Sequence, residues 1–321
     1  MRTAASLTMM AIVDRLAANS AARMTFGVAL RLLTANPWLI TWLRPAANTA
    51  IVGLSSVVAG TRVEPVDAPL GGEWVRAPGA CDDAGVVLVL HGSGYLICSP
   101  RTHRGFASFL SQHSGLPALV VGYPLAPEKT FPAAEDAAMA AYRWLLVQGY
   151  DPRKVVIAGD SAGGHLAVAV ALRAKREGLP APAALALWGP LIDPAYRAPM
   201  ADQRVRRQPF DPKGAARAVA LYVGAADIED PRLCLLNADL ATLPPIQLHY
   251  GTREVMRADA EAFAARVTAS GGHCEQRVWP GLAHGYWMFP RRRNGSLDSM
   301  TTGGEFLRAA VAQPDQPMAQ E

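Results

Sequence analysis

The sequence predicts an α/β fold in which helices cover both faces of a mostly parallel central sheet. Short apolar runs alternate with helix-length stretches, and this alternation is typical of a parallel sheet with crossover helices. The runs are also continuous, as in Val86-Val87-Leu88-Val89-Leu90, whereas a strand with one face in water alternates apolar and polar residues. The sheet is therefore expected to be buried. The chain has 321 residues, 50% of them hydrophobic, which is enough for one large core in a single main domain.

The expected elements follow in chain order. We predict strands over residues 73–76 at an edge, 85–90, 118–122, 155–158, 184–188, 246–250 and 276–279, and helices over 106–114, 133–148, 164–177 and 258–269. Residues 190–231 contain no strand-like run and have prolines near both ends, so we interpret them as an insertion that forms a second cap segment. The predicted organisation is an N-terminal helical cap over residues 1–62, a main domain over 63–312 and a disordered tail over 313–321.

The N-terminal region is strongly apolar over residues 25–60, apart from two arginines. Neither of its charge-free stretches comfortably reaches the roughly 20 apolar residues of a spanning helix, and Pro37 and Pro45 are expected to interrupt it. Asp14 falls where the apolar part of a signal peptide would run. We interpret this region as lid helices that cover an active site at the edge of the sheet. Attachment to a membrane surface and export are the alternatives. The expected location is cytoplasmic, with membrane association left open.

Charge and cysteine content exclude several classes of function. The net charge is only +4 and 18% of the residues are charged, which argues against nucleic acid as a partner. The four cysteines form no CxxC pair, and the seven histidines include no HExxH pattern, so neither a zinc site nor a metal-activated water is predicted. No cofactor is expected, and the chemistry must come from side chains.

The strongest chemical motif is Gly159-Asp160-Ser161-Ala162-Gly163, which follows the strand predicted over 155–158 and opens a helical stretch. This is G-x-S-x-G in the strand-turn-helix context that it requires. A sharp turn lifts the serine hydroxyl above the sheet edge, and the helix N-terminus favours negative charge beside it. The alternative interpretation is an ordinary glycine-rich turn, but such a turn does not require a strand before it and a helix after it. The motif predicts Ser161 as a nucleophile, with Asp160 as a supporting residue.

A second motif lies where the strand ending at Leu90 continues into His91-Gly92-Ser93-Gly94. A glycine-rich loop after a sheet strand can direct backbone N–H groups at the oxyanion of a tetrahedral intermediate. We expect Gly92, Ser93, Gly94 and Ala162 to line this oxyanion hole, with the N–H groups of the last three as donors. His91 stands at the base of the loop, so we interpret it as a bracing residue and not as the general base.

The general base and its orienting acid are expected later in the chain. His284 lies on a glycine-containing loop after the last predicted strand, from which it can reach a serine at the same sheet edge. The acid should precede it, on the loop after the preceding strand. Glu254 comes first on that loop, whereas Asp259 comes where a helix has begun and suits helix capping or support of the loop. We favour Glu254 as the acid and keep Asp259 as the alternative.

Together these motifs resemble the hormone-sensitive-lipase family, which carries an HGGG-type oxyanion loop and a GDSAGG nucleophile turn. The resemblance covers residues 86–289 and includes Tyr123-Pro124-Leu125-Ala126-Pro127-Glu128, which is similar to the family's YRLAPE. It implies the α/β-hydrolase fold with a helical cap. It also implies a serine carboxylesterase or lipase that hydrolyses short- to medium-chain acyl esters through a Ser-His-Glu triad and an acyl-enzyme, without a cofactor.

The sequence departs from the family at several positions, and alternatives remain. Ser93 replaces a family glycine and would be strained if the turn needs a positive φ. Pro124 replaces the arginine of YRLAPE, and His165 stands where the family often has asparagine.

The same site could cleave amides or lactones, and a non-catalytic binding protein could share the fold. The expected partner is a small-molecule ester, and a homodimer and contact of the N-terminal region with a membrane surface are left open.

Overall fold

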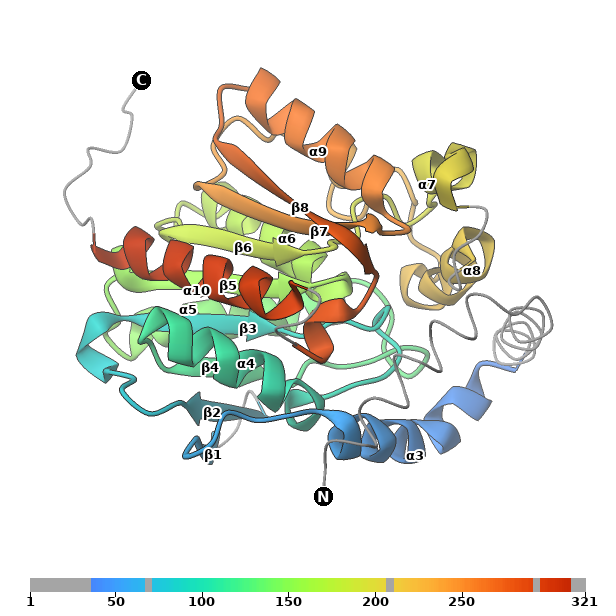
Figure 1. Cartoon of the computed structure of the whole chain (residues 1–321). Coiled ribbons are helices and arrows are strands. Elements are labelled where there is room, and N and C mark those ends of the chain that lie inside the picture. The colour runs from blue at the N-terminus through green and yellow to red at the C-terminus, as the bar shows by residue number, and fades with distance from the viewer. Residues whose placement is uncertain (1–35, 67–70, 206–210, 291–294, 313–321) are drawn as a thin grey trace.

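An eight-stranded sheet runs through the centre of the described part of the chain (Figure 1). The computed structural model describes residues 36–66, 71–205, 211–290 and 295–312. Its strands are β1 (Arg62–Val66), β2 (Gly72–Arg76), β3 (Val86–Leu90), β4 (Ala118–Val121), β5 (Val155–Asp160), β6 (Ala184–Trp188), β7 (Ile246–Arg253) and β8 (Cys274–Ala283). They lie in the order β1-β2-β4-β3-β5-β6-β7-β8. β2 pairs antiparallel with β1 and with β4, and all other neighbouring pairs are parallel. The α/β prediction is confirmed.

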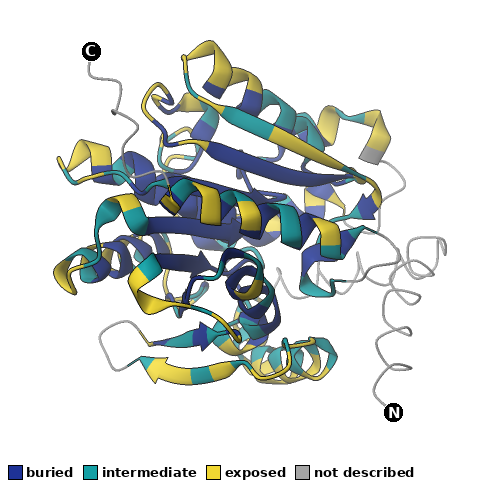
Figure 2. Ribbon diagram, turned by 60° about the vertical axis from the view of Figure 1, so that its left-hand side comes forward, coloured by how far each residue is buried: buried dark blue, intermediate teal, exposed yellow. Residues whose placement is uncertain are grey.

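Helices cover both faces of the sheet. They are α3 (Trp38–Leu54), α4 (Pro100–Ser114), α5 (Ala133–Val147), α6 (Ala162–Arg176), α7 (Arg197–Ala201), α8 (Pro212–Val223), α9 (Arg257–Ala269) and α10 (Ser296–Ala312). Neighbouring residues of a strand enter different cores, because successive side chains point to opposite faces. Leu88 and Ile157 join a cluster with residues of α5, α6 and α9, whereas Val87 and Val156 join a cluster with residues of α4 and α10. Figure 2 shows the central strands as a buried layer between helices whose outer surfaces are exposed.

Each strand and helix predicted from the sequence is present, although several ends differ. α4 begins at Pro100, before the expected residue 106, because Ser99 and Thr102 form a capping box in which the Ser99 N–H donates to Thr102 Oγ1 at 3.0 Å. The insertion between β6 and β7 contains α7 and α8, with no strand among its described residues. In Figure 1 both helices lie to the right of the sheet. Residues 313–321, predicted as a tail, lie outside the described residues.

α3 continues through Pro45, which was expected to interrupt the apolar N-terminal region. Pro45 lies inside the helix, and tertiary contacts on the neighbouring residues explain why the helix continues. Arg44 binds the Glu128 carboxylate at 2.6 Å and donates to the carbonyl oxygen of Leu96 at 2.8 Å, while Asn48 Oδ1 accepts from the N–H of Cys98 at 2.9 Å. The expectation of a break at Pro45 was therefore wrong. The expected boundary after residue 62 also falls inside β1, and residues 1–35 lie outside the described residues.

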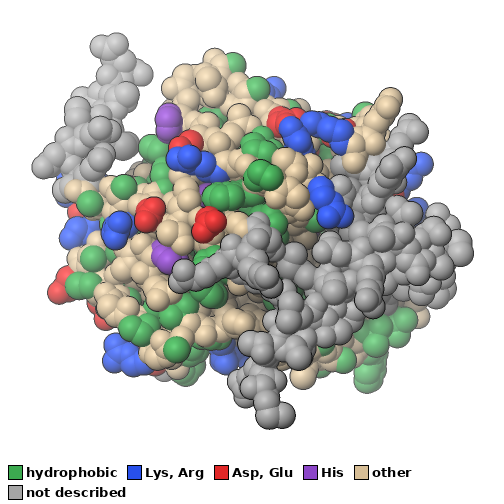
Figure 3. Space-filling model, viewed as in Figure 1, with side chains coloured by type: hydrophobic (Ala, Val, Ile, Leu, Met, Phe, Trp, Pro, Cys, Tyr) green, Lys and Arg blue, Asp and Glu red, His purple; other side chains and the backbone are tan. Residues whose placement is uncertain are grey.

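The outward face of α3 is apolar. Trp38 and Trp42 are 60% and 82% exposed, and Leu39 and Leu43 are exposed beside them. Figure 3 shows hydrophobic side chains gathered over this helix, while basic and acidic side chains are interspersed over the rest of the visible face. Among the described residues, no helix combines the length and the hydropathy needed to cross a bilayer.

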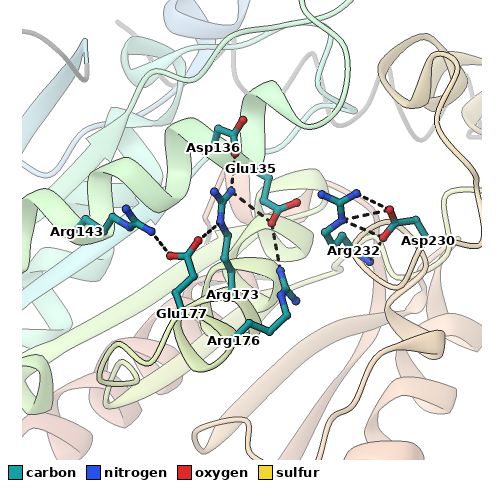
Figure 4. A network of polar contacts seen from close by, with 8 residues as sticks. All are labelled: Glu135, Asp136, Arg143, Arg173, Arg176, Glu177, Asp230 and Arg232. Carbon is teal, nitrogen blue, oxygen red and sulfur yellow. Dashed lines mark hydrogen bonds and ion pairs between the residues drawn. The ribbon is translucent and has the colours of Figure 1, made fainter.

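A network of ion pairs fastens the helices on one face of the sheet (Figure 4). Arg173 of α6 lies 2.8 Å from Glu177 of the following turn and 2.5 Å from Asp136 of α5. The carboxylate of Glu135, which is buried, lies 3.7 Å from Arg173 and 3.6 Å from Arg176. An exposed ion pair contributes roughly 0–1 kcal/mol, so the network adds modestly to a layer that apolar packing already holds.

Candidate active site

Ser161 stands in a sharp turn between β5 and α6. Its backbone has φ 51° and ψ −119°, a conformation that is sterically costly for a residue other than glycine. The flanking glycines make the turn feasible. A β-carbon on Gly159 would collide with the carbonyl oxygen of Gly163, and one on Gly163 would collide with that of Leu90. The serine is thereby placed directly before the first residue of α6, where the helix N-terminus favours developing negative charge.

His284 and Glu254 lie together at the same edge of the sheet. The Nδ1 atom of His284 is 2.7 Å from Glu254 Oε1. Since a carboxylate only accepts, Nδ1 carries the proton and Nε2 is left as the basic nitrogen. Burial alone would lower the pKa of His284, but the charge and the hydrogen bond of Glu254 outweigh it, and the net effect is a raised pKa. Glu254 is itself 1% exposed and also accepts from the N–H of Met256 at 3.1 Å.

The loop of His284 is fastened beside the nucleophile turn. Trp287 follows three residues later, and its ring meets the His284 ring edge-on, with centroids 5.0 Å apart. The Trp287 indole donates to Asp160 Oδ2 at 2.8 Å, and Asp160 directly precedes Ser161. Serine, histidine and glutamate therefore follow β5, β8 and β7 at one sheet edge, in the chain order that the sequence predicted.

The oxyanion loop leaves β3 on the other side of β5. The N–H of Gly92 donates to Asp160 Oδ1 at 2.9 Å, which commits it to a structural bond. Gly92 therefore supplies no free donor, and the expected donors are Ser93, Gly94 and Ala162. Ser93 and Gly94 have φ of 84° and 63°, and their N–H groups, like that of Ala162, have no acceptor within the described residues. The turn does need a positive φ at Ser93, whose hydroxyl lies 2.9 Å from the carbonyl oxygen of Ile97.

Comparison with known proteins places this site in a family. A family model described as an alpha/beta hydrolase fold matches residues 87–288, and an esterase of the bacterial hormone-sensitive lipase family superposes with a TM-score of 0.79 at 34% identity, covering 84% of this chain and 90% of that one. The chain belongs to the hormone-sensitive-lipase family of α/β hydrolases. It is an ester hydrolase.

Proteins similar to this esterase are named as esterases or as an acetyl-hydrolase. An acetyl-hydrolase from Streptomyces hygroscopicus is 36% identical over 75% of this chain and 80% of its own. The esterase LipU from Mycobacterium tuberculosis is 33% identical over 86% of this chain and 94% of its own. The structure of EstE5 soaked with p-nitrophenyl butyrate has a TM-score of 0.78 at 34% identity, over 84% of this chain and 91% of that one.

A buried carboxylate joins the loops of this esterase's site. Asp160 accepts from Gly92 and Trp287, and His103 Nε2 of α4 lies 3.2 Å from its Oδ1. Burial by itself would raise the pKa of Asp160, but His103 and the Trp287 hydrogen bond hold it below its usual range. His103 is 1% exposed. Its spacing from the buried Phe106 and Leu110 on α4 is the signal that could have placed it inside.

His91 supports the oxyanion loop at its base, directly after β3. Its ring stacks on Tyr123 with centroids 4.1 Å apart, and the Tyr123 hydroxyl donates to the His91 carbonyl oxygen at 2.5 Å. Burial lowers the pKa of His91 to about 3, so the ring is neutral at pH 7. These are the contacts of a support and not of a general base.

Asp259 lies in the first turn of α9 and forms no hydrogen bond with His284. It is completely buried, neither carboxylate oxygen has a hydrogen-bond partner among the described residues, and the expected capping bond to α9 is absent. Burial, and then the charge of Asp193, raises the pKa of Asp259 from 3.8 to about 7. This carboxyl is consequently a source of pH-dependent instability.

Replacing Asp259 by asparagine is expected to stabilise the protein above pH 7. The folded state holds the Asp259 proton more tightly than the unfolded chain, so the contribution of Asp259 to wild-type stability falls as pH rises from about 4 to about 7 and is constant above that range. Asparagine does not ionise. The gain in unfolding free energy should be about 2–3 kcal/mol larger at pH 8 than at pH 5, as measured by urea unfolding of both proteins. An equal gain at both pH values would contradict the raised pKa.

Proposed function

We propose that the protein is a serine carboxylesterase that hydrolyses short- to medium-chain acyl esters through Ser161, His284 and Glu254. The observation that carries this proposal is the 2.7 Å bond between buried Glu254 and His284, at the sheet edge where Ser161 precedes α6. The names of relatives support small acyl groups, since one is an acetyl-hydrolase and another was soaked with p-nitrophenyl butyrate.

The reaction would proceed in two acyl transfers. Ser161 Oγ attacks the ester carbonyl while Nε2 of His284 takes its proton, and Glu254 stabilises the imidazolium. The oxyanion is held by the N–H groups of Ser93, Gly94 and Ala162, each worth roughly 3 kcal/mol. His284 then protonates the leaving alcohol, which gives the acyl-serine. Water, deprotonated by His284, attacks the acyl-serine and releases the acid.

Replacing Ser161 by alanine is expected to lower kcat for p-nitrophenyl butyrate by about 10³-fold or more, because the nucleophile is lost. The release of p-nitrophenol by wild type and variant measures the effect. Ser270→Ala is the matched control, since Ser270 is an exposed residue after α9, and it should retain wild-type activity. Equal rates for wild type and Ser161→Ala, with equal thermal unfolding, would exclude Ser161 as the nucleophile.

A further inference from the structure

Ser299 is a buried polar residue on the face of α10 that packs against the sheet (Figure 1). Gly303 follows one turn later on the same face. A β-carbon on Gly303 would collide with the ring of Trp188, the last residue of β6, so the glycine lets α10 approach the sheet closely. The hydroxyl group of Ser299 is therefore held against the end of β6.

Three side chains converge on this hydroxyl group. The indole N–H of Trp188 donates to Ser299 Oγ at 2.9 Å, and the hydroxyl of Tyr286 lies 2.8 Å from the same oxygen. Nδ1 of His249, in β7, lies 3.2 Å from it. Buried polar networks are rigid when every member is satisfied, so the cluster is a firm anchor if each donor meets an acceptor.

The direction of these hydrogen bonds follows from a carboxylate at the far end of the network. Because the carboxylate of Glu275 only accepts, Gln247 directs its NH₂ group to it at 2.6 Å and its amide oxygen to Nε2 of His249 at 2.8 Å. Nε2 therefore carries the proton of the imidazole, and burial lowers the pKa of His249 to about 3, so the ring is neutral at pH 7. Nδ1 is then an acceptor, for Ser299 and for the Trp279 indole at 3.3 Å.

Ser299 consequently uses its hydrogen and its lone pairs in different directions. The hydrogen goes to Nδ1 of His249, and the oxygen accepts from Trp188 and from Tyr286. Burial raises the pKa of Tyr286 well above its usual value, so the tyrosine keeps the proton that it donates. One hydroxyl group thus satisfies two aromatic donors at once.

These two donors belong to the segments that carry the reacting side chains. Tyr286 comes two residues after His284 on the same loop, and the backbone carbonyl oxygen of Trp188 accepts the N–H of Ser161 at 2.9 Å. A chain of hydrogen bonds therefore runs from the loop of His284 through Ser299 to the backbone of the nucleophile.

The loop of His284 also has the anchor described above, the bond between Trp287 and Asp160. A single anchor would leave the loop able to pivot, whereas anchors on the neighbouring residues Tyr286 and Trp287 also fix its orientation. Orientation is what proton transfer between Ser161 and His284 requires, because the two groups must lie within hydrogen-bond reach.

We propose that Ser299 is a positioning residue whose hydroxyl group, through Tyr286 and Trp188, sets the orientation of the His284 loop relative to Ser161. It lies on α10, behind the sheet edge, and touches no substrate atom in the proposed reaction. This inference rests on the proposed function, because it assumes that His284 takes the proton of Ser161.

The first test removes the Tyr286 hydroxyl and keeps the ring. Tyr286→Phe should lower kcat for p-nitrophenyl butyrate by about 10-fold with little change in KM, since a misplacement of ~1 Å can cost up to roughly 10²-fold. Tyr142→Phe is the matched control. Tyr142 is buried on α5 and donates to the carbonyl oxygen of Pro180 at 2.7 Å, so this variant also loses one hydrogen bond of a buried tyrosine. It should lower the unfolding temperature to a similar extent and keep the wild-type kcat.

The second test is a double-mutant cycle. Ser299→Ala should lower kcat at least as much as Tyr286→Phe, and adding Tyr286→Phe to Ser299→Ala should cause no further loss, because the bond is already broken. Losses in kcat that multiply in the double variant would show that the two residues act separately, and would overturn the proposal.

The outcomes separate the inference from the proposed function. If Tyr286→Phe unfolds at a lower temperature but keeps the wild-type kcat, as Tyr142→Phe should, the anchor is structural only and the esterase proposal stands. This comparison decides the question even if Ser299→Ala does not fold. A wild-type protein that fails to cleave p-nitrophenyl butyrate would overturn the proposed function and the inference together.

Discussion

Replacing Glu254 by glutamine is expected to lower kcat/KM for p-nitrophenyl butyrate by about 10³–10⁴-fold. The charge that stabilises the imidazolium of His284 is lost, and the amide can present its NH₂ group to Nδ1 and so favour the wrong tautomer. The same charge raises the pKa of His284, so the residual activity should persist to lower pH than in the wild type. A pH–rate profile between pH 5 and pH 9 measures both effects.

Two variants control for Glu254→Gln. Asp259→Asn should remain within a few-fold of wild-type activity, because Asp259 is buried on α9 and has no hydrogen bond to His284. Glu254→Asp keeps the charge and should recover part of the activity. If Asp259→Asn proved the more damaging change, the orienting acid would have to be reassigned to Asp259.

The parts of the fold that the sequence predicted are those governed by local pattern. Continuous apolar runs located the buried strands, since only a strand covered on both faces tolerates them. β1 was missed because its residues are exposed or half-buried at the sheet edge, so they form no continuous apolar run. α10 was missed because glycines and threonines weaken its helical pattern. α3 continues through Pro45 because Arg44 is bound by residues more than eighty positions away, which no local signal contains.

Chain order and motif context predicted Ser161, Glu254 and His284 as the triad, and the fold brings the carboxyl ends of β5, β7 and β8, which these residues follow, to one edge. The supports of these residues were harder to find. His103 and Trp287 become relevant only when α4 and the loop after β8 converge on Asp160. The N–H of Gly92 also donates to that carboxylate, a contact between the oxyanion loop and β5 that no local pattern contains.

Replacing Asp160 by asparagine is expected to cause the second large effect, a loss of both stability and kcat. Asp160 accepts from Gly92 and lies against His103 through Oδ1, and accepts from Trp287 through Oδ2. An asparagine has one accepting oxygen, so at least one of these groups faces an NH₂ donor instead. Breaking a buried charged contact costs roughly 3–5 kcal/mol, and kcat for p-nitrophenyl butyrate should fall by about 10- to 100-fold as the loops shift. Thermal unfolding and steady-state kinetics measure the two quantities.

Trp287→Phe provides the comparison that separates positioning from stability. It removes the donor to Oδ2 but keeps an aromatic ring against His284, so its loss in kcat should be smaller than that of Asp160→Asn. Because Asp160 holds the loops of the oxyanion donors and of His284, and touches no substrate atom in the proposed reaction, its loss should appear in kcat more than in KM. An Asp160→Asn enzyme that unfolds at a lower temperature yet keeps its wild-type kcat would limit Asp160 to a structural role, with the two loops held in place by their own turns.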